Sequence, residues 1–135
     1  MNINRMKASA IRHQMEMQAM ANSEGKHAQH IRDYCDEIQK TIERYGNSFE
    51  IFDRDADYQR SVSFCILQIG ELTSKLSSEY RQATASSIQW GPIKGMRNLV
   101  AHNYGSMSRD IIWETAVNDI PVLRTFCDQQ VRAHT

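Results

Sequence analysis

Cysteine is scarce in this chain, and its spacing argues against a disulfide or metal framework. The 135 residues include three cysteines, Cys35, Cys65 and Cys127, which is an odd number without a C-x-x-C pair. Each lies among apolar residues at helical spacing, a pattern typical of buried free thiols. We therefore expect no metal site and no resident cofactor, and a reducing, cytoplasmic location.

Long apolar runs are also missing. No stretch approaches the roughly 20 apolar residues that cross a membrane, and the N-terminus lacks the apolar core of a signal peptide. A chain of 135 residues fits one domain and buries a sizeable core without metals or disulfides. These features predict a soluble, cytoplasmic protein with no membrane partner.

A net charge of either sign is absent as well. The chain carries 16 basic and 16 acidic residues, which disfavours a protein that coats nucleic acid through bulk electrostatics. The charges are nevertheless segregated, because no Asp or Glu occurs between Tyr80 and Arg109. The basic residues and the histidine of this segment are Arg81, Lys94, Arg97, His102 and Arg109. We expect any phosphate-binding surface to be local and to coincide with it.

Alternation at the period of a strand is absent, and apolar residues instead recur at intervals of three and four. The segments with this pattern run from Lys26 to Tyr45, from about Ala56 to Leu76, from Gly91-Pro92 to Gly105, and from Ser106 or Ser108 toward the C-terminus. We expect Pro121 to bend or break the last of them. The sequence therefore predicts an all-α, up-and-down bundle of four to five helices.

The first 25 residues are Met-rich and polar and show only a loose helical stripe. We expect residues 1–25 to form an N-terminal extension and residues 26–135 to form the helical domain. A frayed helix and a disordered segment are both compatible with the extension. Methionine also suits adaptable interfaces, so contact with a partner is a further interpretation.

One short segment concentrates groups that handle a phosphate. Arg97, His102 and Tyr104 follow the pattern Arg-x4-His-x-Tyr near the end of a short helix. Arginine forks onto phosphate oxygens, and histidine takes and gives a proton near neutral pH. On the pattern alone, simpler interpretations are favoured: His102 caps the helix C-terminus, Arg97 makes a surface ion pair, and Tyr104 forms an ordinary hydrogen bond.

Helical geometry separates the arginine from the histidine. At ~100° per residue, Arg97 and His102 lie ~140° apart around one ideal helix, whereas Arg97 and Tyr104 share a face. Three arrangements would bring Arg97 and His102 to one phosphate. The helix could loosen around Ala101 to Asn103, the long Arg97 side chain could reach across, or a second protomer could complete the site.

The segment from Arg97 to Tyr104 closely resembles the signature of the HEPN superfamily, specifically the HepT-like (DUF86) ribonuclease toxins. The resemblance extends over roughly Lys26 to Val131. Other elements similar to the family are Gly95-Met96-Arg97-Asn98, Ile69-Gly70-Glu71, Trp90 and Asp119-Ile120-Pro121. The 25-residue leader departs from the family pattern, and so does Leu72-Thr73 after the Gly-Glu pair.

The resemblance implies a HEPN-like bundle and a metal-independent endoribonuclease, the toxin of a type VII-like toxin–antitoxin pair. His102 would be the acid or base, Arg97 would stabilise phosphoryl charge, and Asn98 would orient either group or contact phosphate. Tyr104 would receive AMP from a minimal nucleotidyltransferase antitoxin. The family likeness also implies a symmetric homodimer with its Arg and His residues at the cleft between subunits.

Glu71 and the pair of His27 and His30 each have two interpretations. Glu71 lies close to the buried stripe of its helix, where it either supports Arg97 or is a plain exposed carboxylate. His27 and His30 are three residues apart, but only Asp33 lies near them at helical spacing. Exposed histidines explain this pair better than a metal site.

Two other functions remain open. The runner-up is a non-catalytic helical subunit that presents substrate to a nucleotidyltransferase, although a pure binding module has no need of a proton-transfer group beside the arginine. The third is an inactive structural bundle, in which Arg97 and His102 could be replaced with small changes in stability alone.

Overall fold

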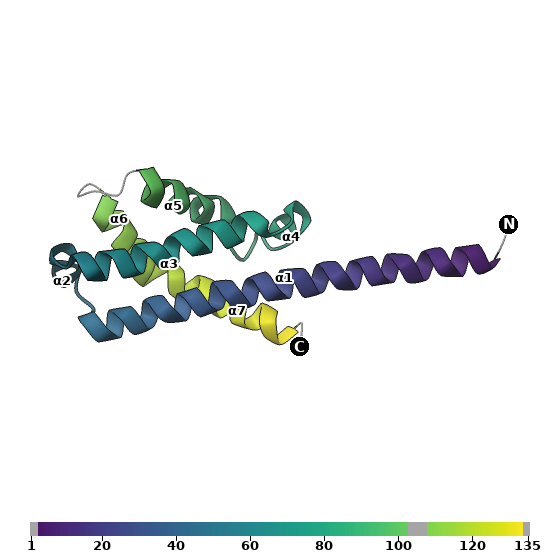
Figure 1. Ribbon diagram of the computed structural model, residues 1–135, viewed down its shortest axis with the longest axis horizontal. Coiled ribbons are helices and arrows are strands. Elements are labelled where there is room, and N and C mark those ends of the chain that lie inside the picture. The colour runs from purple at the N-terminus through teal and green to yellow at the C-terminus, as the bar shows by residue number, and fades with distance from the viewer. Residues whose placement is uncertain (1–2, 103–107, 134–135) are drawn as a thin grey trace.

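The computed structural model describes residues 3–102 and 108–133, and these residues form helices joined by short turns (Figure 1). The elements are α1 (Ile3–Tyr45), α2 (Phe49–Arg54), α3 (Ala56–Lys75), α4 (Ser78–Ala83), α5 (Trp90–His102), α6 (Arg109–Glu114), the π-helix η2 (Thr115–Asp119) and α7 (Ile120–Ala133). No strand occurs in these two ranges. The all-α prediction is confirmed.

The long helices pack as a bundle in which α3 lies between α1 and α5, while α7 packs on α1 (Figure 1). Two ion pairs fix the direction of α7 relative to α1. Arg32 Nη1 lies 3.2 Å from Asp128 Oδ1, and Arg124 Nε lies 3.0 Å from Asp36 Oδ1. Since one residue number falls as the other rises, the two helices run antiparallel, as an up-and-down bundle requires.

The predicted helix that ends at Tyr45 is present, and a glycine ends it. Gly46 has φ +120°, a conformation that side-chain-bearing residues rarely adopt. Its carbonyl accepts a hydrogen bond of 2.9 Å from the buried Tyr58 hydroxyl. The buried face of α1 within the bundle consists of Ala28, Ile31, Cys35, Ile38 and Ile42.

The N-terminal extension is helical. Of the interpretations left open for residues 1–25, the structure has a helix, because α1 begins at Ile3 and continues through Gly25 without a break. The residues there are mostly Met, Ala, Gln, Arg and Glu, which favour a helix even where apolar periodicity is weak. Figure 1 shows this part of α1 projecting well beyond the bundle.

Two short helices lie outside the segments in which the sequence predicts helices. They are α2 and α4, each six residues long, which is too short for apolar periodicity to appear. Side chains cap the starts of two helices: Asp55 accepts from the backbone N–H groups of Asp57 and Tyr58 and so begins α3. Ser77 begins α4 in the same way through Tyr80 N–H.

The final segment stays helical through its proline. We expected Pro121 to bend or break it. The helix does not break, because α7 directly follows η2 and continues to Ala133, but the π-helix interrupts the regular α-helix just before the proline. A proline lacks an N–H and its ring collides with the carbonyl four residues earlier. The wider π-helical turn just before Pro121 changes this spacing, so no break is needed. Ser108 precedes α6 as predicted, whereas Gly105 and Ser106 lie outside the described residues.

The three cysteines are free and buried. Burial raises the pKa of the Cys65 and Cys127 thiols to about 12, and it raises the pKa of Cys35 as well. These groups are therefore protonated and unreactive at neutral pH, as the spacing suggested. None of the described helices has an apolar stretch long enough to pass through a bilayer.

Candidate active site

A glycine in the middle of α3 sets the position of α5. A Cβ atom added at Gly70 would lie 2.7 Å from Arg97 Cβ and 3.4 Å from Arg97 Cα. No side chain fits in that space, so only glycine allows α5 to approach α3 this closely. The arginine of the motif is therefore seated directly on the backbone of α3.

The residue after this glycine contacts the arginine. Arg97 Nε donates a hydrogen bond to Glu71 Oε1, and the two side chains remain 45% and 43% exposed. A pair this open to solvent contributes only about 0–1 kcal/mol to stability. Its main physical effect is to hold the guanidinium in one direction, which agrees with the supporting role considered for Glu71.

Asn98 makes the second contact to Arg97. Arg97 Nη1 donates to Asn98 Oδ1 over 3.3 Å. A guanidinium has five N–H groups, and within the described part of the chain Glu71 and Asn98 each engage one of them. Counting the described residues alone, the other donors can fork onto an anion such as a phosphate.

His102 is the last described residue of α5 and is exposed. It lies four residues after Asn98, so the two side chains share a helix face and are neighbours one turn apart. Asn98 therefore contacts Arg97 and lies one turn before His102. Its expected role in orienting either group remains a prediction.

The three arrangements considered for the motif can now be compared. The helix does not loosen at Ala101 or His102, because α5 is regular through both. Arg97 Nη1 contacts Asn98, the next residue of α5, and whether the arginine also reaches toward His102 remains a prediction. Whether a second protomer also contributes remains a prediction, and so does the role of Tyr104, which lies outside the described residues.

The inner side of α5 anchors the helix in the core. Trp90 is buried at its start, where Trp90 Nε1 donates to Thr84 Oγ1 over 2.9 Å and the ring packs edge-on against Phe126. Met96 Sδ lies 3.6 Å from Thr115 Oγ1 of η2. Arg97 and His102 therefore extend from a helix that is fixed on its inner side.

An apolar cavity of about 340 Å³ lies under α5, but it does not include the motif. Its lining residues include Ile66, Ile69, Ile93, Met96, Thr115 and Ile120. None of Glu71, Arg97, Asn98 or His102 lines it. The candidate active site is instead an open surface cluster at the crossing of α3 and α5, which suits a polymer substrate better than a small enclosed ligand.

Comparison with known proteins finds a family that covers most of the chain. The family described as "Ribonuclease HepT-like" matches residues 31–130, a range that contains the whole cluster. A protein of Caldanaerobacter subterraneus subsp. tengcongensis named "Putative RNase TTE0752" is 34% identical over 95 residues, which cover 70% of this chain and 82% of that protein. No solved structure matches the chain.

Proposed function

Because the chain belongs to the HepT-like ribonuclease family, we propose that it is a metal-independent endoribonuclease and the toxin of a two-component toxin–antitoxin pair. The observation that supports this most is the contact series from Glu71 to Arg97 to Asn98, one helical turn before His102. In the proposal Arg97 is the phosphate-binding group and His102 the proton-transfer group, and both side chains are exposed.

The proposed reaction uses the RNA itself as the nucleophile. The ribose 2′-hydroxyl attacks the adjacent phosphorus, and the bond to the 5′-oxygen of the next nucleotide breaks. The products are a 2′,3′-cyclic phosphate and a 5′-hydroxyl, so the 2′-hydroxyl proton leaves and the departing oxygen gains one. DNA lacks the 2′-hydroxyl and is not a substrate.

His102 and Arg97 have different roles in the proposed reaction. His102 acts as the general acid or base, a contribution of about 10²–10⁴ in rate. Arg97 stabilises the charge that grows on the phosphoryl oxygens. Asn98 orients the guanidinium or contacts phosphate, and Glu71 is a positioning residue that acts through Arg97.

Regulation is proposed to act at Tyr104, two residues after His102. A minimal nucleotidyltransferase antitoxin would transfer AMP from ATP to the Tyr104 hydroxyl and release pyrophosphate. The added group is bulky and anionic, so it would block the site and repel RNA by the same local electrostatics that govern phosphorylation. A homodimer and a cytoplasmic location are part of the same proposal.

Cleavage of RNA in EDTA by purified protein tests this function. Arg97→Ala should abolish cleavage, whereas Arg54→Ala, which removes an exposed arginine of α2, should leave it intact. Intact mass should first establish that the protein carries no AMP. Equal activity of the two variants would contradict the role of Arg97, and no cleavage by the unmodified parent would favour the non-catalytic subunit.

A further inference from the structure

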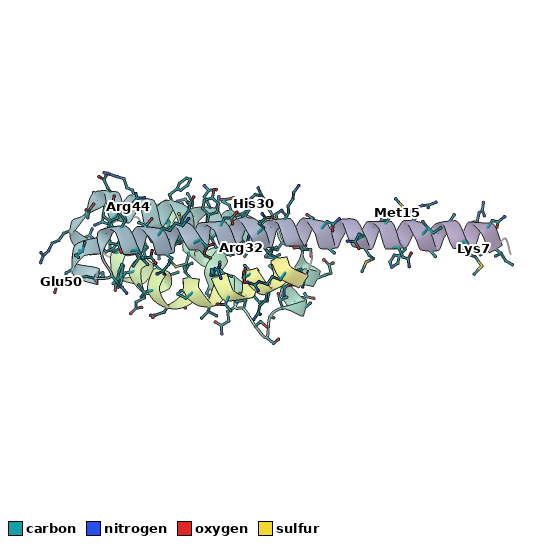
Figure 2. All side chains as sticks on the ribbon, turned by 90° about the horizontal axis from the view of Figure 1, so that it is seen from below. Lys7, Met15, His30, Arg32, Arg44 and Glu50 are labelled. Atoms are coloured by element: carbon teal, nitrogen blue, oxygen red, sulfur yellow. The ribbon has the colours of Figure 1, made fainter. Side chains whose placement is uncertain are left out.

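The N-terminal part of α1 exposes apolar side chains along its length. Every side chain from Ile3 to Gln18 is exposed, and Figure 2 shows no other described element beside this part of the helix. Its large exposed apolar residues are Ile3, Met6, Ile11, Met15 and Met17. Helices gain most of their stability from packing of an apolar face, so an uncovered helix of this length needs a partner.

One apolar stripe of the projection continues the buried face of the bundle. At 100° per residue, Met6, Ala10, Met17 and Ala21 fall within about 60° of arc on the helix. They share this direction with Ala28 and the other buried residues of α1 listed above. The face that packs inside the bundle therefore extends, uncovered, along the projection.

The helix that covers this face ends where the projection begins. The pairs Arg32–Asp128 and Asp36–Arg124 fix the antiparallel register of α7 on α1. When this register is continued toward the end of α7, its last described residue, Ala133, lies level with His27 of α1. Figure 1 shows the C-terminus near the point where α1 leaves the bundle. Another helix in line with α7 would extend the same packing.

We propose that this helix is the projection of a second copy of the chain, paired antiparallel about a two-fold axis between His13 and Gln14. In this register Met6 lies opposite Ala21, and Ala10 lies opposite Met17. Each large side chain meets a small one, which is the complementarity that close packing requires. The pairing is isologous, so both copies bury the same stripe.

A buried carboxylate at the base of the projection supports the antiparallel direction. Glu24 Oε1 accepts a hydrogen bond of 3.1 Å from Ser77 N–H, but Glu24 Oε2 is buried and has no partner among the described residues. A buried oxygen without a hydrogen bond is costly. The proposed register brings the partner subunit's Lys7 within four residues of Glu24 along the axis, about 6 Å, and side chains on a helix lean toward its N-terminus, here toward Glu24.

A parallel pair fits less well. It would place Lys7, which flanks the stripe, level with Lys7 of the partner subunit, although like charges repel. It would also direct the partner helix along the stripe into the end of α7. Antiparallel pairing avoids both problems and leaves the two bundles at opposite ends of the paired helices. This pairing is independent of the proposed ribonuclease activity and separate from any contact that joins two active sites.

Sedimentation velocity of the full chain tests the pairing with two matched variants. Met17→Glu places a charge on the stripe, whereas Met15→Glu places the same charge two residues away and about 160° around the helix. Met17 and Met15 are 54% and 67% exposed, so neither change disturbs the bundle core. We expect Met17→Glu to lower the mass of the parent assembly and Met15→Glu to retain it. Equal masses for parent and Met17→Glu would overturn the proposal.

Disulfide cross-linking tests the register. Ala10→Cys and Met17→Cys proteins should form an intermolecular disulfide when mixed under mild oxidation, because these positions face each other only in an antiparallel pair. The parent should not cross-link, since its three thiols are buried. Cross-linking of Ala10→Cys with itself at equal yield, or no cross-link in the mixture, would overturn the register.

Discussion

At the scale of single residues, Gly70 has the clearest structural requirement in the candidate site. An added methyl group there would overlap Arg97 Cβ at 2.7 Å, and this atom cannot move unless α5 moves. We predict that Gly70→Ala destabilises the protein by about 1–3 kcal/mol and reduces RNA cleavage by displacing Arg97. Urea unfolding and cleavage assays of the same variant measure the two effects.

Gly95 is the matched control for this change. It also lies in a helix, two residues before Arg97, but an added Cβ would meet nothing within 4 Å. Gly95→Ala should retain cleavage and stabilise the protein by about 0.5–1 kcal/mol, since alanine is the better helix former. If Gly70→Ala behaved like Gly95→Ala, the close packing of α5 on α3 would not be required for function.

The Glu71–Arg97 pair gives a second prediction at this scale. Because both side chains are almost half exposed, Glu71→Ala should change the free energy of unfolding by less than about 1 kcal/mol. It should nevertheless lower kcat more than it raises KM, because a free guanidinium loses its orientation toward the transition state. Partial recovery in Glu71→Gln, which keeps an acceptor, would support positioning, whereas parent kinetics in Glu71→Ala would exclude it.

At the scale of elements, the start of α3 depends on one side chain. Asp55 Oδ1 accepts from the N–H groups of Asp57 and Tyr58 over 2.9 and 3.1 Å. We predict that Asp55→Ala costs about 0.5–2 kcal/mol in thermal or urea unfolding. Asp57→Ala removes an exposed ion pair with Arg60. It should lower the free energy of unfolding by only about 0.3 kcal/mol. Equal losses would mean that negative charge, and not the cap, stabilises α3.

The long helices of the bundle could be predicted because their apolar periodicity is strong. The short helices and the extension of α1 could not, because their apolar periodicity is weak. The apolar repeat of α3 and the end of the preceding helix at Tyr45 were predicted from the sequence. In contrast, α2 and α4 have six residues each, and the extension of α1 has good helix formers but only a loose apolar stripe. The π-helical turn before Pro121 has no local motif in the sequence that would have predicted it.

The residues of the candidate site could be selected from the sequence, but the contacts between them could not. Arg97, His102, Asn98 and Glu71 were all selected from the sequence, largely through the family resemblance. The contact that joins α3 to α5 at Gly70 could not be derived, because spacing within one helix carries no information about another helix. A lone glycine inside a strong helical pattern was the available signal, since it marks a possible close approach.

At the scale of the whole molecule, the buried thiols predict a loss of stability at high pH. The thiols of Cys65 and Cys127 have a pKa of about 12 in the folded protein, against 9.0 as the ordinary value. Above pH 9 the unfolded chain releases these protons and the folded chain keeps them, so the free energy of unfolding falls as pH rises from about 9 to 12. Each thiol contributes up to about 1.4 kcal/mol per pH unit.

Urea unfolding across this pH range measures the effect. Cys127→Ala removes one of the thiols and should therefore give a shallower decrease in stability than the parent between pH 9 and 11. The comparison uses slopes, because the smaller side chain also leaves a cavity that lowers stability at every pH. An unchanged slope would mean that Cys127 is not protonated in the folded state at these pH values.

The most direct test of the proposed activity is to map the ends of RNA cut in EDTA by the parent protein and by His102→Ala. The proposal predicts that the parent leaves 2′,3′-cyclic phosphate and 5′-hydroxyl ends, and that His102→Ala loses most of this cleavage. A 2′-deoxy nucleotide at a mapped cut position should block cutting there. Cutting at the deoxy position, or equal cleavage by His102→Ala, would contradict the account.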